Sequence, residues 1–267
     1  AQERPQGRLP GNRDPLAPPV PIIQHADVQR MLLTQQVIVE GSLSLAAFCT
    51  RLSDLAHVTT DEAAKHDAWL LLEILTPVVK TYSTEQGIRA VSLGLQVLGG
   101  YGFTLDFPLQ QYYRDIRIMS IYEGTTGIQS LDLLGRKILL ENGKAFKLLI
   151  AEVEKTVQLA ASDPELQPFA ETLQQEIRRL TEVTQHLVAF ARAGQVERFT
   201  ADATVYMEMT GLIVIAWQWL QLALAARQQR SGGRFSPDFY DQIHMCLRFY
   251  FRYELPHAAA NAKTLVM

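Results

Sequence analysis

Apolar residues recur along most of the chain at intervals close to the period of an α-helix. The first such run follows residue 23 and includes Val28, Met31, Leu32 and Val39. Side chains three and four positions apart share one face of a helix, so this spacing predicts an amphipathic helix. Asp27 stands just ahead of the run, where an N-cap or a first-turn acid is favourable.

The next apolar run predicts helix on both sides of a proline. It begins near residues 60–62, Thr-Asp-Glu, where acids are favoured by the helix dipole. Because proline lacks an N–H and restricts the residue before it, we expect a kink or break just ahead of Pro77. A further helix is expected over about residues 84–98, with Gly99-Gly100 as its C-terminal stop.

The second half of the chain also shows helical periodicity. The helices expected there cover about residues 146–157, 166–193, 204–226 and 237–265, the last with Ser236 as cap, Pro237 as first residue and an interruption at Pro256. Residues 231–233 predict a turn before that last helix. With no solenoid-type repeat and no convincing strand, the pattern predicts an all-α protein of two packed helical bundles.

The first 23 residues read differently. Five prolines fall between Pro10 and Pro21, which excludes a helix interior and indicates an extended linker. The polar opening lacks the apolar segment of a signal peptide and resembles the inside of a longer chain. We therefore divide the sequence into residues 1–23, the end of a preceding segment with its linker, then helical domains at 24–140 and 141–267.

Composition narrows the class of protein. The 267 residues are 48% hydrophobic with a formal net charge of −3, which is typical of a globular chain and argues against nucleic acid as a partner. The most apolar window, residues 211–226, is shorter than a membrane span and contains Gln218 and Gln221, so we expect a buried core helix and no integral membrane segment.

The cysteines and histidines suggest no metal or disulfide chemistry. Cys49 and Cys246 stand alone, outside any CxxC pair, so we expect two buried free thiols in a reducing, cytoplasmic compartment. The six histidines are scattered and form no ligand pair with a third partner, so we assign no metal.

Residues 99–125 lack a clean long period and crowd glycines, aromatics and charges together. Gly99, Gly100 and Gly102 form a GGxG loop, which alone is most often a helix C-cap or turn but also permits close approach of the backbone to a phosphate. Glu123 lies between Tyr122 and Gly124. A loop glutamate is usually only solvated, so neither feature is decisive by itself.

The combination of several sequence motifs in this region is more specific than any one of them. Four runs occur in order: QVLGGYGF at 96–103, YYRD at 112–115, RI at 117–118 and IYEGTTGIQ at 121–129. Together, in residue type and in spacing, they closely resemble the signature of the acyl-CoA dehydrogenase family. The resemblance covers residues 1 to about 140, the family's final helical domain. Residues 141–267 resemble the extra helical domain of its larger bacterial members.

The resemblance implies a flavin site shared between chains. In the family, the glycine loop (Gly99, Gly100 and Gly102) and the preceding glutamine, here Gln96, contact the adenine-dinucleotide part of FAD across a dimer interface. Thr125 and Gln129 would lie near the flavin, and either Thr125 or Thr126 would cap the next helix. Arg4 corresponds to an arginine of a Glu-Arg segment that reaches FAD, although Gln6-Gly7-Arg8 replaces the Phe-Gly that usually follows.

The resemblance also implies a reaction. Glu123 would be the base that removes the α-proton of an acyl-CoA, and its backbone N–H would hydrogen-bond the thioester oxygen. Such a base benefits from an apolar pocket that raises its pKa. Tyr122 would line the acyl site and Gly124 would leave room for the thioester. We expect Arg114 and Asp115 to pair structurally. For Arg136 and Lys137 the alternatives are an approach to the CoA phosphates and a solvated helix face, and we expect the solvated face.

Several alternatives stay open. The family's amino-terminal and middle domains have no counterpart here, so this chain alone should bind FAD poorly and be inactive. The leading hypothesis is an FAD-dependent acyl-CoA dehydrogenase, a homodimer or larger, which passes electrons to electron-transferring flavoprotein. There are two competing hypotheses. One is an acyl-CoA oxidase with the same base, and the other is a non-catalytic helical subunit of a heteromeric dehydrogenase. Acyl specificity does not follow from these residues.

Overall fold

The computed structural model describes residues 1–230, 232 and 234–267, and within them the chain is helical. The only β-type pairing among these residues is an isolated bridge between Pro5 and Pro21. The 3-10 helices are η1 (Ile22–Gln24), η2 (Gly99–Phe103) and η3 (Lys137–Leu139). The α-helices are α1 (Ala26–Val58), α2 (Glu62–Leu98), α3 (Leu109–Met119), α4 (Thr126–Gly135), α5 (Leu140–Ala161), α6 (Gln167–Arg192), α7 (Val196–Thr200), α8 (Ala203–Gln229), α9 (Pro237–Tyr253) and α10 (Pro256–Leu265).

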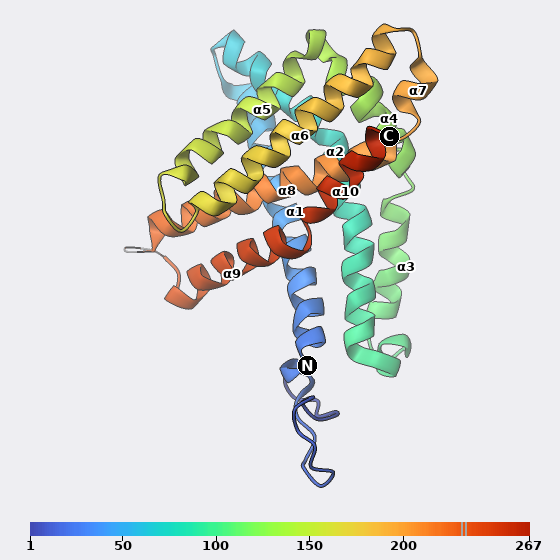
Figure 1. The fold of residues 1–267 in the computed structure, drawn as a ribbon, viewed down its shortest axis with the longest axis vertical. Coiled ribbons are helices and arrows are strands. Elements are labelled where there is room, and N and C mark those ends of the chain that lie inside the picture. The colour runs from blue at the N-terminus through green and yellow to red at the C-terminus, as the bar shows by residue number, and fades with distance from the viewer. Residues whose placement is uncertain (231, 233) are drawn as a thin grey trace.

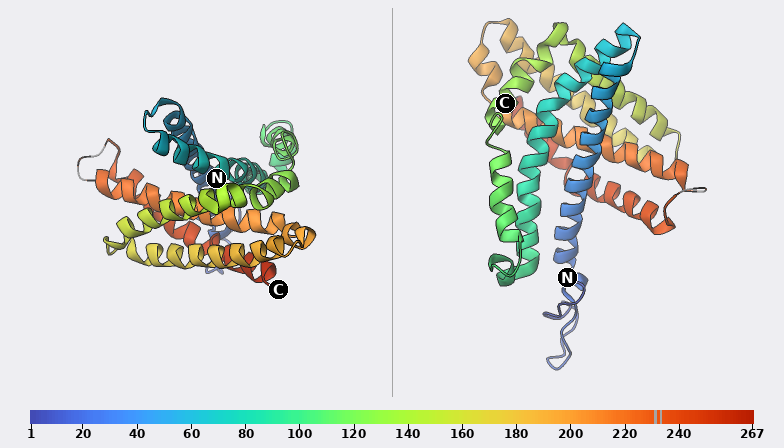
Figure 2. Two further views of the ribbon diagram at one scale, coloured as in Figure 1. Left: turned by 90° about the horizontal axis from the view of Figure 1, so that it is seen from above. Right: turned by 180° about the vertical axis from the view of Figure 1, so that it is seen from behind.

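Two long helices, α1 and α2, pack against each other and extend beyond the rest of the molecule (Figures 1 and 2). The short α3 packs along the lower part of α2, and the amino-terminal segment lies below α1 (Figure 1). A layer formed by α5, α6, α8, α9 and α10 crosses the upper part of this pair. The expectation of an all-α architecture is thus confirmed for the described residues.

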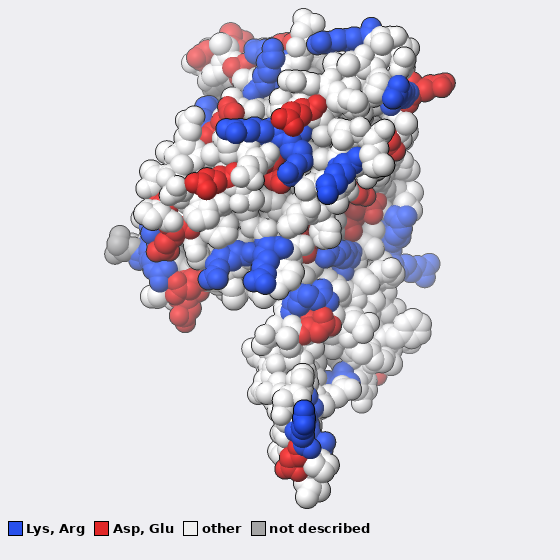
Figure 3. All heavy atoms as spheres, viewed as in Figure 1, with Lys and Arg blue, Asp and Glu red and all other residues white. Residues whose placement is uncertain are grey.

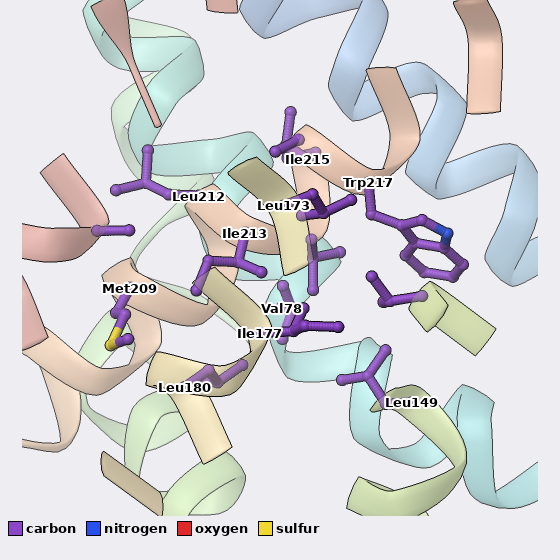
Figure 4. Close-up of a cluster of buried hydrophobic side chains, with 14 of the residues drawn as sticks. Val78, Leu149, Leu173, Ile177, Leu180, Met209, Leu212, Ile213, Ile215 and Trp217 are labelled. Atoms are coloured by element: carbon purple, nitrogen blue, oxygen red, sulfur yellow. The ribbon is translucent and has the colours of Figure 1, made fainter. Parts of the chain in front are cut away.

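Helix α8 forms the centre of the molecule and contacts α1, α2, α4, α5, α6, α9 and α10. Trp217 and Trp219 are completely buried, and the close-up of the core shows Trp217 among apolar side chains of α2, α5, α6 and α8 (Figure 4). Two helices, α1 and α8, are long and apolar enough to cross a membrane, but 78% of the α8 window is buried in the protein. Residues 211–226 therefore form the core helix that the sequence predicts.

Of the kink or break expected just ahead of Pro77, the break is not found. Helix α2 continues from Glu62 through Pro77 to Leu98. Leu75, Pro77 and Val78 are all buried, so tertiary packing holds this segment helical even though one backbone hydrogen bond is lost at the proline. The helix predicted from residue 84 is the second half of the same element.

The irregular segment 99–125 also contains a helix that the sequence prediction missed. Helix α3 occupies Leu109–Met119, and none of its residues is buried. Its apolar residues Leu109, Tyr112, Tyr113 and Ile116 recur at helical spacing over this short stretch. Leu109 and Ile116 are half-buried against α2.

Local signals at helix ends are confirmed. The Asp61 carboxylate accepts hydrogen bonds from the N–H groups of Ala63 and Ala64 and caps α2. Ser236 caps α9, whose first residue is Pro237, and the predicted interruption at Pro256 separates α9 from α10. The turn predicted at residues 231–233 falls mostly outside the described residues.

The two cysteines are free and buried, as predicted. Burial raises the pKa of the Cys49 thiol to about 11 and that of Cys246 to about 12, so both are protonated at neutral pH. On the face shown in Figure 3, positive and negative side chains are interspersed rather than segregated. Among the described residues, no group of three or more His, Cys, Asp or Glu side chains could hold a metal ion.

Candidate active site

The predicted base lies in a short loop, residues 120–125, which we call the Glu123 loop. It connects α3, which packs along α2, to α4, and α4 also contacts α2. Thr125 is the N-cap of α4, and its hydroxyl accepts from the N–H of Ile128 at 3.4 Å. The predicted capping is confirmed, with Thr125 as the N-cap. Because the helices before and after the loop both pack against α2, α2 supports the loop on both sides.

The backbone of this loop is unusual at two consecutive residues. Glu123 has φ of 52° and Gly124 has φ of 92°. A positive φ is uncommon for any residue with a side chain. At Gly124 a Cβ would also lie 2.8 Å from Nε2 of Gln129. Glycine at position 124 is therefore needed first for the conformation of the loop itself.

Both carbonyl groups of this turn are tied to neighbouring helices. Gln129 of α4 donates from Nε2 to the Glu123 carbonyl at 3.0 Å. Lys80 of α2 donates from Nζ to the Gly124 carbonyl at 2.6 Å. A third tie follows at Thr126, whose hydroxyl donates to the Glu85 carboxylate of α2. The turn is thereby held between α2 and α4.

The N–H groups of the same turn are available. Within the part of the chain that the structure describes, neither the Glu123 N–H nor the Gly124 N–H has an acceptor. The turn leads directly into the N-terminus of α4, where the helix dipole is positive. This arrangement can donate hydrogen bonds to an oxygen that carries negative or partial negative charge.

The environment of the Glu123 side chain requires a correction. The expected desolvated, apolar pocket is not formed by the described residues, because Glu123 is exposed. Tyr122 is 44% exposed, and its hydroxyl donates to the sulfur of Met119 at 2.8 Å. Burial of the Glu123 carboxylate therefore requires a surface from outside this chain.

The glycine loop lies at the carboxyl end of α2, whereas the Glu123 loop contacts the middle of that helix. Gly99 is the C-cap of α2 with φ of 62°, so the simple helix-stop interpretation is confirmed. A Cβ on Gly102 would lie 2.8 Å from the Leu95 carbonyl oxygen, so this position packs against the helix end. Gly100 has open space around it and Gln96 is exposed, so these two residues remain free to contact a ligand.

Arg4 approaches this same loop. Its guanidinium donates from Nη1 to the Leu98 carbonyl at 2.6 Å and lies 5.0 Å from the ring centroid of Tyr101. The fold thus brings the amino-terminal arginine beside Gly99 and Gly100. A cation next to exposed glycine backbone is a suitable environment for a phosphate.

The predicted site residues form two separate groups. Gln96, Gly99, Gly100, Gly102 and Arg4 lie at the carboxyl end of α2, whereas the Glu123 loop contacts α2 at Lys80. Nineteen residues of helix separate Lys80 from Gly99, which is about 28 Å at the normal helical rise. One chain therefore cannot place both groups on the same end of one ligand.

Two other expectations are not met. Arg114 and Asp115 are both exposed on α3 and form no ion pair with each other, because neighbouring residues on a helix point in different directions. Lys137 is buried and its ammonium contacts the Glu73 carboxylate, so it does not belong to a solvated face. Arg136 is exposed, as expected, and pairs with Asp132 at 2.5 Å.

A separate cleft lies between α2, α4, α8 and the carboxyl-terminal segment. It has a volume of about 550 Å³, and its lining residues include Glu85, Arg89, Thr126, Glu208 and Glu254. Glu123 is not among its lining residues. Its buried acid, Glu254, is already paired with Arg89 at 2.6 Å. We therefore place the candidate chemistry at the Glu123 loop rather than in this cleft.

The structure also adds Lys80 and Glu85, which sequence reasoning missed. Both lie within α2: Lys80 is 44 positions before Gly124 of the loop, and Glu85 is 41 positions before Thr126 at the start of α4. No local pattern marks them, because the contact depends on how α3 and α4 return alongside α2.

Comparison with known proteins agrees with these features. A family model described as "Acyl-CoA dehydrogenase, C-terminal domain" matches residues 15–139, and one described as "Acetyl-CoA dehydrogenase C-terminal like" matches residues 149–267. The chain is 39% identical over 220 residues to 3-methylmercaptopropionyl-CoA dehydrogenase of Ruegeria pomeroyi, covering 80% of this chain and 36% of that protein. It is 29% identical over 267 residues to the broad-specificity linear acyl-CoA dehydrogenase FadE5 of Mycobacterium tuberculosis, covering 96% and 43%.

Solved structures show the same fold. The Caenorhabditis elegans ACDH-11 structure in complex with C11-CoA has a TM-score of 0.69 at 22% identity, covering 87% of this chain and 37% of that chain. A Bacillus anthracis acyl-CoA dehydrogenase complexed with FAD also has a TM-score of 0.69, at 16% identity, covering 92% and 43%. The chain spans well under half the length of these relatives. It belongs to the acyl-CoA dehydrogenase family of flavoprotein oxidoreductases and corresponds to the carboxyl-terminal region of its members.

Proposed function

We propose that the protein carrying this chain catalyses FAD-dependent α,β-dehydrogenation of an acyl-CoA thioester to the trans-2-enoyl-CoA, with Glu123 as the base. The observation that carries the proposal is the turn at Glu123 and Gly124. Its carbonyls are tied back to Gln129 and Lys80, while the N–H of Glu123 is left open beside the carboxylate. This places a hydrogen-bond donor and a base on one residue.

Each part of the turn has a role in that reaction. The Glu123 N–H donates to the thioester oxygen and stabilises the negative charge that develops there when the α-carbon loses its proton. The Glu123 carboxylate accepts that proton. Gly124 lets the turn adopt its positive φ, and Tyr122 lies next to the base at the acyl site.

The residues present fit part of an FAD site. The exposed backbone at Gly99 and Gly100, with Arg4 beside it, suits the phosphate-bearing part of a dinucleotide, and Gln96 and Gly102 complete this loop. When bound, FAD supplies the acceptor for the β-hydrogen as hydride. Thr125 and Gln129 lie at the start of α4, on the side expected to face the flavin. Because the two groups are about 28 Å apart along α2, the glycine loop of one protomer would serve the flavin of its partner.

The surface around the site supports a larger assembly. Apolar side chains are exposed on η2, in the connection from η2 to α3, on α3 and in the Glu123 loop, among them Tyr101, Phe103, Leu105, Tyr112, Ile118 and Tyr122. A concentration of this kind marks a surface that is covered in the functional protein. We propose that the amino-terminal and middle domains and a second protomer cover it and desolvate Glu123. Electron-transferring flavoprotein is the proposed acceptor, in the cytoplasm.

The Glu123→Gln substitution tests the proposal in the full-length flavoprotein. It removes the base but keeps the size of the side chain, so bleaching of the flavin by an acyl-CoA should slow by at least about 100-fold, within the usual worth of a general base. Stopped-flow absorbance measures this rate. Glu141→Gln is the matched control, because Glu141 is another partly exposed glutamate with positive φ.

The results of these experiments distinguish the proposed dehydrogenase from the alternative functions. Full flavin reduction by the Glu123→Gln protein would show that the base assignment is wrong. A wild-type protein that binds flavin but is never reduced by any acyl-CoA would favour a non-catalytic role. Oxygen consumption that matches turnover would indicate an acyl-CoA oxidase rather than a dehydrogenase.

A further inference from the structure

We propose that Lys80 is a positioning residue for the base: its ammonium holds the Gly124 carbonyl and thereby sets the backbone of Glu123 in the geometry that proton abstraction needs. This inference rests on the function proposed above. It assigns a role to a residue in the middle of α2 that lies outside the sequence motifs of the site.

The hydrogen bond from Lys80 to the Gly124 carbonyl is strong, and the helix that carries Lys80 is rigid. Lys80 Nζ donates to the Gly124 carbonyl at 2.6 Å, and a hydrogen bond from a charged donor is roughly twice as strong as a neutral one. Lys80 is itself half-buried, and its neighbours Leu75, Val78 and Tyr82 on α2 are buried in the core. The backbone that carries Lys80 is therefore fixed by packing, and the loop must adapt to it.

The contact acts where the loop is least stable by itself. Glu123 and Gly124 both have positive φ, and a glutamate adopts this conformation only when its surroundings impose it. Lys80 donates to the Gly124 carbonyl, which follows Gly124, and Gln129 donates to the Glu123 carbonyl, which precedes it. Without the Lys80 contact the peptide between Gly124 and Thr125 can rotate, which would shift Glu123, with its N–H and its carboxylate, relative to α4 and to a bound thioester.

Lys80 could serve only the stability of the fold, so the experiment must separate that role from positioning of Glu123. Lys80→Met removes the donor and keeps the length of the side chain, whereas Lys80→Arg keeps a charged donor. Lys144→Met is the matched control. Lys144 of α5 pairs at 2.7 Å with Asp67 of α2, the helix that also carries Lys80, but this pair is far from the Glu123 loop. All variants are made in the full-length flavoprotein, with Glu123→Gln as reference.

Flavin reduction by an acyl-CoA deuterated at the α-carbon provides the decisive measurement. In Lys80→Met we expect the reduction rate to fall by about 10- to 100-fold, the effect of misplacing a catalytic group by about 1 Å. The isotope effect from the α-deuteron should increase, while flavin content and the KM for acyl-CoA change little. Lys80→Arg should recover most of the rate, and Lys144→Met should match wild type.

A second measurement does not depend on activity. In the full-length flavoprotein labelled with ¹⁵N-glycine, the Gly124 amide resonance should shift or broaden in Lys80→Met, while that of Gly135 stays in place. A Gly124 resonance that does not change would overturn the inference. So would a Lys80→Met enzyme with wild-type rate and isotope effect, or one whose loss is explained by lost flavin and thermal stability alone.

The two proposals fail in different ways. If Glu123→Gln keeps full activity, the proposed function fails whatever Lys80 does. If Glu123→Gln is inactive and Lys80→Met is unaffected, only the positioning role is lost.

Discussion

At the scale of single residues, the site depends on where a Cβ atom fits. Gly99, Gly100 and Gly102 look equivalent in the GGxG loop, yet the structure gives them different tasks. Gly99 adopts a positive φ to end α2, Gly102 packs against the Leu95 carbonyl, and Gly100 faces open space. Of these three, Gly100 is the position whose missing side chain is not explained by the fold of this chain, which agrees with a role in contacting a ligand.

Substitution of two of these glycines separates packing from ligand contact. Gly102→Ala should destabilise the chain by about 1–3 kcal/mol, because its Cβ would be forced against backbone. Gly100→Ala should change stability by no more than about 0.5 kcal/mol, as expected at an open surface position. Urea unfolding followed by circular dichroism measures both. Equal effects of the two substitutions would contradict this assignment.

At the scale of elements, α2 organises both the site and the core. Along this helix, Lys80 and Glu85 contact the Glu123 loop and α4, and Arg89 contacts the carboxyl-terminal segment. Arg89 donates to both oxygens of Glu254, at 2.6 and 3.0 Å, and the Glu254 side chain is only 3% exposed. This ion pair connects the helix of the site to the junction between α9 and α10.

Breaking this pair on one side should be costly. Arg89→Met leaves a buried carboxylate without its partner, and we expect a loss of about 3–5 kcal/mol in the free energy of unfolding. Adding Glu254→Gln removes the uncompensated charge and should recover part of that loss in a double-mutant cycle. Arg136→Met, which breaks the exposed pair with Asp132, is the control and should cost under about 1 kcal/mol. Strict additivity of the Arg89 and Glu254 substitutions would contradict the coupling.

At the scale of the whole molecule, one core connects both regions that the two family models match. The cluster of buried side chains runs without interruption from Val37 in α1 to Leu265 in α10. Helix α8 belongs to the second region, yet it packs against α1, α2 and α4 of the first. The division at residue 140 that we infer from the sequence is therefore not a division of the hydrophobic core.

This continuity predicts how the chain unfolds. We expect one cooperative transition, because removing either region would expose the apolar face of α8 or of its partners in the other region. Circular dichroism reports on all helices, whereas tryptophan fluorescence reports mainly on Trp217 and Trp219 in the core. The two signals should give the same urea midpoint. Two separate transitions, or a folded fragment ending at residue 140, would show that the regions are independent.

Much of this protein follows from local properties of the sequence. Caps and stops at Asp61, Gly99, Ser236 and Pro256 act on the nearest turn of backbone, so the residues themselves predict where α2 begins and ends and where α9 and α10 lie. The all-α class follows from apolar periodicity, which reports the buried face of each helix. The run around Glu123 identifies the family because several motifs coincide at the right spacing.

Only the tertiary structure decides the remaining features, because they depend on contacts between distant parts of the chain. Packing keeps α2 helical through Pro77, which local propensity alone would break. The contact of Lys80 with Gly124 joins residues 44 positions apart, which no local pattern can indicate. The exposure of Glu123 has the same origin: residue types can predict a base, but its burial depends on every surface that packs around it.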